Sequence, residues 1–215
     1  MPLRLAGVCG LLAPVTFVTG FVLGGLAQPD AYSPFHDDLS DLGALTADSP
    51  WLYNQLGVNL TGLLVVAFAF GLWAALGRSL LGRLGAAALL VVGVGLFLDG
   101  LFRLDCQGID AGCDNSSWHA SAHKIESGFT GMAFIVAPLL LAFAFRRLPE
   151  WRDRWLPTLL AVPALVVTSV VVGLVGTGAG NLAASTVWFL WLAFVAAHLL
   201  RLQRGVGPAV PAPPQ

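Results

Sequence analysis

Six long runs of apolar residues, separated by shorter polar segments, dominate the hydropathy pattern of this chain. Each run is about 20 residues long, the length that an α-helix needs to cross the hydrocarbon core of a bilayer. The pattern predicts an all-α polytopic membrane protein, a bundle of six transmembrane helices. The spans are expected at about 5–27, 51–76, 84–102, 118–145, 155–176 and 182–200.

The composition supports this fold class. Hydrophobic residues make up 57% of the 215 residues and charged residues 11%, whereas a soluble domain carries about 25% charged residues. We expect one six-helix domain over residues 1–200 and a disordered, Pro-rich cytoplasmic tail over 201–215. The formal net charge of −1 argues against a nucleic acid partner, which leaves the lipid bilayer as the predicted partner.

The positive charges indicate how the spans are threaded. With six spans, both termini, the turn 77–83 and the connector 146–154 share one side, which carries nine of the eleven Lys and Arg residues. Cytoplasmic loops are enriched in these residues, so we expect both termini in the cytoplasm. The acidic loop 28–50 and the polar segment 99–126 then face outward. The near absence of Lys and the bias towards Ala, Gly and Val indicate a GC-rich bacterial genome. The expected location is therefore the bacterial inner membrane.

Two cysteines, Cys106 and Cys113, lie seven residues apart in the outward-facing segment. Disulfides persist on the outer side of the cell membrane, and C-x6-C is not a usual spacing for zinc-binding thiolates. The pattern therefore favours a disulfide over a thiolate metal site. Closing so short a loop would stabilise the protein by about 2–3 kcal/mol.

Histidine and carboxylate side chains recur at helical spacing where the fourth span begins. His119 and His123 are four residues apart and Glu126 follows three residues later, so all three share one helix face. Imidazole and carboxylate groups at this spacing suit a divalent metal such as zinc, and the predicted ligands are His119, His123 and Asp105. A solvated histidine pair at a helix start is the alternative interpretation.

Four further polar side chains are candidates for catalysis at the same boundary, because a hydrolase needs a nucleophile or a general base. They are Ser40, Asp41, Asp99 and Glu126. Asp99 lies near the end of the third span, where a carboxylate is costly without a partner, and Arg103 four residues later is the expected partner. The segment 38–41 would alternatively cap a short helix through Ser40 or Asp38.

Three short motifs follow one another in a characteristic order: SDLG at 40–43, FRLD at 102–105 and SWHASAH at 117–123. In this order the chain resembles, over about residues 5–200, the bacterial six-span membrane family catalogued as domain of unknown function 998 (DUF998). It departs from the usual family pattern in having Arg103 where a proline is common, and in its cysteine pair. The resemblance implies a six-helix membrane fold and no established activity.

A fainter likeness is to the membrane hydrolase superfamily of the alkaline ceramidases, which is similar in using a Ser, an Asp and an H-x3-H pair around zinc. The corresponding residues here would be Ser40 for the Ser, Asp99 or Asp105 for the Asp, and His119 with His123 for the pair. That superfamily normally has seven spans, however. Three functions compete. They are a non-catalytic structural or envelope-associated protein, a metal-dependent hydrolase acting on a lipid-like substrate, and a small-solute transporter lined by Asn54, Asn59 and Asp99.

Overall fold

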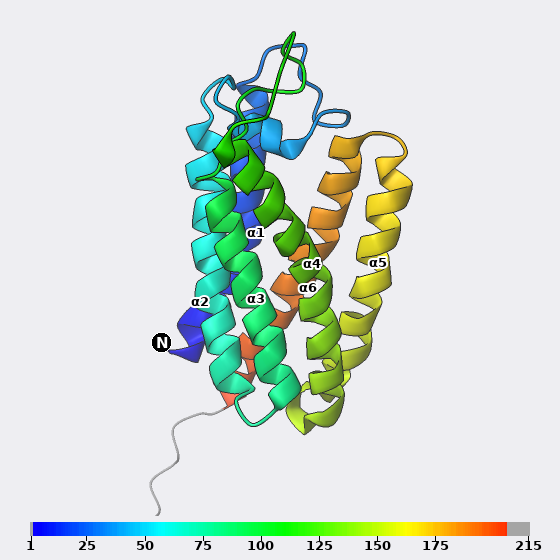
Figure 1. The fold of residues 1–215 in the computed structure, drawn as a ribbon. Helices are drawn as coiled ribbons and strands as arrows, with labels where there is room; N and C mark the ends of the chain where they lie inside the picture. Colours follow the sequence, from blue (N-terminus) through cyan, green and yellow to red (C-terminus); the bar gives the residue numbers. More distant parts are fainter. Residues whose placement is uncertain (1, 206–215) are drawn as a thin grey trace, which may run out of the picture.

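The computed structural model describes residues 2–205, with side chains through residue 203, and all six predicted spans are helices long and apolar enough to cross a membrane (Figure 1). Residues 201–205 of the predicted disordered tail are helical, and the rest of that tail lies outside the described residues from position 206 onward. The long helices are α1 (Leu3–Leu26), α2 (Leu60–Ala75), α3 (Leu80–Asp99), α4 (Trp118–Arg147), α5 (Trp155–Gly173) and α6 (Thr177–Gly205). Three short helices are η1 (Leu39–Gly43), η2 (Leu52–Asn59) and η3 (Pro149–Arg154).

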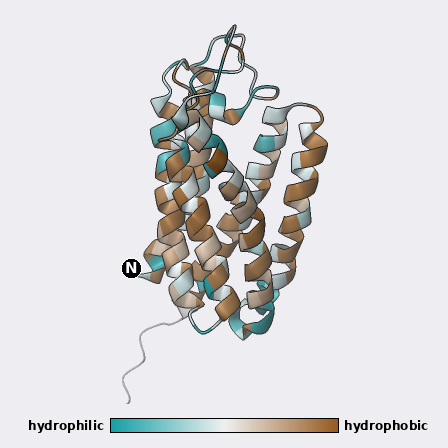
Figure 2. Ribbon diagram, viewed as in Figure 1, coloured by the Kyte–Doolittle hydropathy of each residue, from teal (hydrophilic) through white to brown (hydrophobic). Residues whose placement is uncertain are grey.

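The helices form a ring in chain order. Each of the six packs against the next, and α6 returns to pack against α1. The beginning of α1 and the end of α6 lie at one end of the bundle (Figure 1). The two long connections, 27–51 and 100–117, cover the opposite end, which we call the loop end. Hydrophobic residues run along the helices, and hydrophilic residues concentrate towards the two ends (Figure 2).

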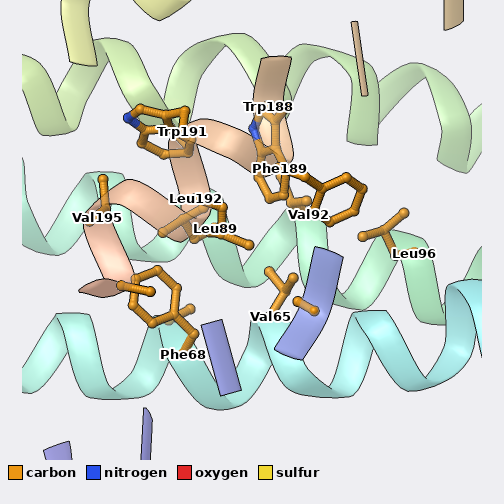
Figure 3. Close-up of a cluster of buried hydrophobic side chains, with 14 of the residues drawn as sticks. Val65, Phe68, Leu89, Val92, Leu96, Trp188, Phe189, Trp191, Leu192 and Val195 are labelled. Atoms are coloured by element: carbon orange, nitrogen blue, oxygen red, sulfur yellow. The ribbon is translucent and has the colours of Figure 1, made fainter. Parts of the chain in front are cut away.

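The centre of the ring is filled by large side chains from α2, α3 and α6 (Figure 3). Phe68 on α2, Leu89 on α3 and Leu192 on α6 are fully buried in one apolar cluster. Close helix approach depends on glycine: a Cβ at Gly20 on α1 would collide with the backbone of Gly57 on η2, as expected for a small-residue helix contact. This packing joins the six helices into one bundle.

Several predicted helix boundaries differ from the structure, and two of them bear on the loop end. The third span ends at Asp99 rather than at 102. The Gly-rich segment 176–181 was expected to be a turn before a helix at 182, but α6 already begins at Thr177. Its first turn is held by the loop before η1: Ala179 N donates to Phe35 O at 2.8 Å and Thr177 Oγ1 donates to His36 O at 2.8 Å. Tertiary contacts thus override the low helix propensity of glycine.

A π-helix carries the amides at the start of the second span. Asn54 is 2% exposed, and its Nδ2 donates to Gly43 O at 3.0 Å. With its amide oriented to donate, Asn59 reaches Phe97 O at 2.9 Å and Asn54 O at 3.2 Å. Both amides therefore satisfy backbone carbonyls at the loop end, as a polar group inside a membrane requires.

Candidate functional site

The SDLG segment forms η1 and joins the two connections of the loop end. Asp38 stands at the N-terminus of η1, but its side chain does not cap the helix; it accepts instead from Asn181 Nδ2 on α6 at 3.3 Å. Gly43 O accepts from Asn54 and also from Arg103 Nε at 2.7 Å. A Cβ at Gly43 would collide with the Asn54 amide, so glycine is the residue that fits here.

Arg103 is not the partner of Asp99. Its guanidinium donates to Gly43 O and, through Nη2, to Ala44 O at 2.6 Å. The predicted pair rested on the i, i+4 spacing of a helix that ends near residue 102. Because α3 ends at Asp99, Arg103 lies in the connection and its side chain turns towards η1. Arg103 thus links the two connections of the loop end, and the contacts of Asp99 are with other residues.

The predicted disulfide is confirmed: Cys106 and Cys113 are bonded. The loop that it closes is tied down by Asn115, whose Oδ1 accepts from Asp105 N at 2.7 Å and from Cys106 N at 3.2 Å. Asp105 Oδ2 in turn accepts from Ser117 N at 3.1 Å. Hydrogen bonds from Ser117 are the main reason why the pKa of Asp105 is lowered. Asp105 is therefore held as a carboxylate directly before α4.

Asp41 is a buried acid between the two connections. It is 5% exposed, and its Oδ1 accepts from Gly108 N at 3.2 Å. Its main-chain oxygen accepts from Gln107 Nε2 at 3.2 Å. Burial is the largest influence on this carboxyl and raises its pKa to about 6, despite the opposing hydrogen bond from Gly108. Asp41 is therefore a loop-end group that can exchange a proton near neutral pH.

The structure brings together one group of three side chains that combine a histidine with two acids: Asp99, His123 and Glu126. His123 Nδ1 lies 3.4 Å from Asp99 Oδ1 and 4.0 Å from Glu126 Oε1. One potential ligand atom from each residue lies within 4.8 Å of the others. Asp99 is the last residue of α3, and the other two lie in the first turns of α4, so the two helices converge at this cluster.

The other predicted metal ligands form a separate pair. His119 Nε2 lies 3.5 Å from Asp105 Oδ1, and His119 Nδ1 lies 2.8 Å from Arg103 O. Since a carbonyl oxygen only accepts, His119 Nδ1 carries the hydrogen of that contact. Among the described residues, His119 and Asp105 belong to no group of three potential ligands.

The two carboxylates of the cluster cannot both carry an uncompensated charge. At 4.8 Å and an effective dielectric constant of about 20, two negative charges repel each other by about 3.5 kcal/mol. Their side chains are only 16% and 10% exposed, so water offers limited relief. The pair therefore requires a shared proton, a protonated imidazole or a bound cation.

The cluster lines a cavity of about 840 Å³. Ser40 and Asp41 line the wall at the loop end, Asp99 and His123 line it beside them, and apolar residues of α4, α5 and α6 line the deeper part. Three lining residues are substantially exposed on the outside of the bundle: Ile135 (38%), Val166 (43%) and Val170 (60%). The cavity therefore opens sideways between α4 and α5, on a face that lies within the membrane-spanning segments.

The comparisons with known proteins identify the family and nothing narrower. No curated protein and no solved structure matches the chain. One family model, described as "Protein of unknown function (DUF998)", matches residues 11–203, a range that includes η1, both connections and all residues of the cluster. This integral membrane protein belongs to the DUF998 family, in agreement with the resemblance of its three motifs.

Proposed function

We propose that the protein binds one amphipathic, lipid-like molecule in the cavity between α4, α5 and α6. The observation that supports this proposal is the lining of the cavity, which changes from carboxylate, imidazole and hydroxyl groups at the loop end to aliphatic and aromatic side chains below. A volume of about 840 Å³ is within the range of small-molecule sites, about 300–1,000 Å³. A headgroup would lie beside the cluster and a hydrocarbon chain along the apolar wall.

The charge distribution supports an orientation in which this ligand comes from the outer leaflet. Nine of the eleven cationic residues belong to the helix ends and turns opposite the loop end. By the positive-inside rule, that end is cytoplasmic, the loop end faces outward, and a bacterial inner membrane is the expected location. The sideways opening between α4 and α5 would then admit a lipid without removing it from the bilayer.

Two glycines on α4 allow a matched test. A Cβ at Gly131 or at Gly128 would meet no atom within 4 Å, and both residues are exposed, but only Gly131 lines the cavity. Gly131→Phe therefore adds a ring at the cavity wall from a position where the Cβ meets no atom within 4 Å, whereas Gly128→Phe adds the same ring elsewhere on the helix. Binding of a lysophosphatidylethanolamine with a fluorescent label on its chain would be titrated in detergent micelles.

We expect one saturable site in the parent protein, at least tenfold weaker binding in Gly131→Phe, and unchanged binding in Gly128→Phe. Equal titrations of all three proteins, or no saturable site in the parent, would contradict the proposal. Cysteine labelling of intact cells tests the orientation separately. A single cysteine at exposed Asp114, in a chain whose own cysteines are replaced, should react with a membrane-impermeant maleimide.

A second candidate function is a metal-dependent hydrolase acting on such a molecule. It is favoured by the presence of Ser40, Asp41, Asp99 and Glu126 on one cavity wall, because hydrolysis requires a positioned base beside the scissile bond. Water would add across an ester or amide bond of the bound lipid, and a carboxylate would accept the proton of that water. Release of nitrophenol from a long-chain p-nitrophenyl ester, abolished in Glu126→Gln, is the expected result; no release above background would refute this candidate.

A further inference from the structure

His123 presents a buried ring that the protein does not fully satisfy. The residue is 7% exposed and lines the cavity. Its Nδ1 lies 2.9 Å from Phe102 O and therefore donates its hydrogen to that carbonyl. No described residue hydrogen-bonds to its other nitrogen, Nε2, and this atom is not among the enclosed unpartnered atoms of the described residues, so it stays accessible. Nε2 can therefore carry the ring hydrogen when Nδ1 binds a ligand.

Asp99 has its contacts within the cluster. Its Oδ1 lies 3.4 Å from His123 Nδ1, whose hydrogen is directed to Phe102 O, and its carboxyl pairs with the carboxyl of Glu126. Glu126, by contrast, is oriented by two hydroxyl groups: Ser127 Oγ donates to Oε1 at 2.9 Å and Thr130 Oγ1 donates to Oε2 at 3.2 Å. Hydrogen bonds of this kind hold metal-binding carboxylates in place. The cluster thus combines one carboxylate oriented from outside with a second carboxylate and an imidazole that lie beside it.

From this arrangement we propose that Asp99, His123 and Glu126 bind one divalent metal ion of the zinc class in the cavity wall. Ligands around a four-coordinate zinc ion with bonds of about 2.0–2.1 Å are about 3.3 Å apart. The separation of 3.4 Å between His123 Nδ1 and Asp99 Oδ1 already has this value. Glu126 Oε1 lies 4.0 Å from His123 Nδ1 and within 4.8 Å of the Asp99 ligand atom, so it needs to move by about 1–1.5 Å to reach the spacing of zinc ligands.

The ligand types select the class of metal. One imidazole nitrogen with two carboxylate oxygens suits zinc, manganese or ferrous iron better than calcium or magnesium, which take oxygen ligands, or cuprous copper, which takes sulfur. The positive ion also removes the repulsion between the two carboxylates. Three protein ligands leave a coordination position open for water or for a polar headgroup in the cavity, as in catalytic zinc sites.

Metal binding at this site requires the other tautomer of His123. In the metal-free protein the hydrogen of His123 Nδ1 points to Phe102 O, and a ligating nitrogen must carry no hydrogen. The hydrogen would therefore move to Nε2, and the hydrogen bond to Phe102 O would be given up for the bond to the metal.

His119 supplies a matched control for His123. Each histidine lies on α4 with Nδ1 against a carbonyl of the preceding connection, at 2.8 Å and 2.9 Å, and with a carboxylate nearby. Only His123 belongs to the group of three potential ligands. Cobalt(II) is a suitable probe, because its visible absorption reports coordination. Purified protein in detergent would be titrated with cobalt(II) and then with zinc(II), for the parent, His123→Gln, Glu126→Gln and His119→Gln.

We expect one cobalt(II) ion per chain in the parent and in His119→Gln, displaced by an equal amount of zinc(II), and at least 100-fold weaker binding in His123→Gln and Glu126→Gln. Tryptophan fluorescence and elution volume would check that each variant is folded. No stoichiometric binding in the parent, or equal loss in His119→Gln, would overturn the proposal. Gly131→Phe should keep the metal while losing the amphiphile, so failure of either proposal leaves the other intact.

Discussion

Asp41 should make the loop end more stable in acid than at neutral pH. Burial raises its pKa from 3.8 to about 6, so the folded protein holds this proton more tightly than the unfolded chain does. The stabilisation from Asp41 is then complete below about pH 4 and is lost as the pH rises through 6. Above pH 6 the folded state carries a buried carboxylate, whose cost the unfolded chain avoids.

Asp41→Asn isolates this cost. The amide oxygen still accepts from Gly108 N, as Asp41 Oδ1 does at 3.2 Å, but the side chain cannot ionise. A rise of about two units corresponds to about 3 kcal/mol. About half of that is expected, roughly 1.5 kcal/mol, because the carboxyl faces the cavity and keeps part of its hydration. The variant should therefore be more stable than the parent at pH 8, with no advantage at pH 4.5.

The assay is thermal unfolding in detergent micelles, followed by tryptophan fluorescence from pH 4.5 to 8. The difference in Tm between variant and parent cancels the contribution of every other group. Asp48→Asn removes an exposed acid of the same connection and controls for the loss of one charge. If the Asp41→Asn difference did not change with pH, or if the variant were less stable at pH 8, burial of this carboxyl would not be the dominant effect.

Three further predictions concern the fold. Cys106→Ser removes the disulfide, so reduction should no longer change the electrophoretic mobility of the protein. The free energy of unfolding should fall by about 2.5 kcal/mol, the loop-closure value for a separation of seven residues. Gly20→Val should prevent α1 from packing on η2 and lower Tm, whereas Gly25→Val, at a site with nothing within 4 Å, should leave Tm unchanged. His198→Phe keeps an aromatic ring but loses two hydrogen bonds, from Arg154 Nε to Nδ1 and from Nε2 to Glu150 O, and a Tm drop equivalent to about 1–3 kcal/mol is expected.

The spans could be predicted from the sequence because their signal is strong and local. A helix that crosses a bilayer satisfies its own backbone, so an apolar run of sufficient length fixes the element without knowledge of its neighbours. The ends of the helices depend on more than the run. The Gly-rich segment 176–180 resembles a turn in isolation, but it forms the start of α6, where Ala179 N and Thr177 Oγ1 donate to the carbonyls of Phe35 and His36.

The residues of the candidate cluster could be selected from the sequence, but their grouping could not. Spacing i, i+4 places His119 and His123 on one helix face, yet the two are about 6 Å apart along the axis and differ by about 40° in direction. That offset is enough for His119 to meet Asp105 in the connection while His123 meets Asp99 at the end of α3. Which acid each histidine meets depends on how α4 is rotated against α3, and no spacing within α4 contains that information.

The cavity could not be predicted from the sequence for a similar reason. Small residues in a membrane helix usually indicate close packing, and Gly20 against Gly57 is such a contact. Gly131 carries the same sequence signal, yet a Cβ there would meet nothing within 4 Å, because it faces the space between α4 and α5. A glycine leaves space beside its helix. Whether the backbone of another helix or a ligand fills that space depends on the position of the neighbouring helix. The comparison of Gly131 with Gly128 tests which of the two applies here.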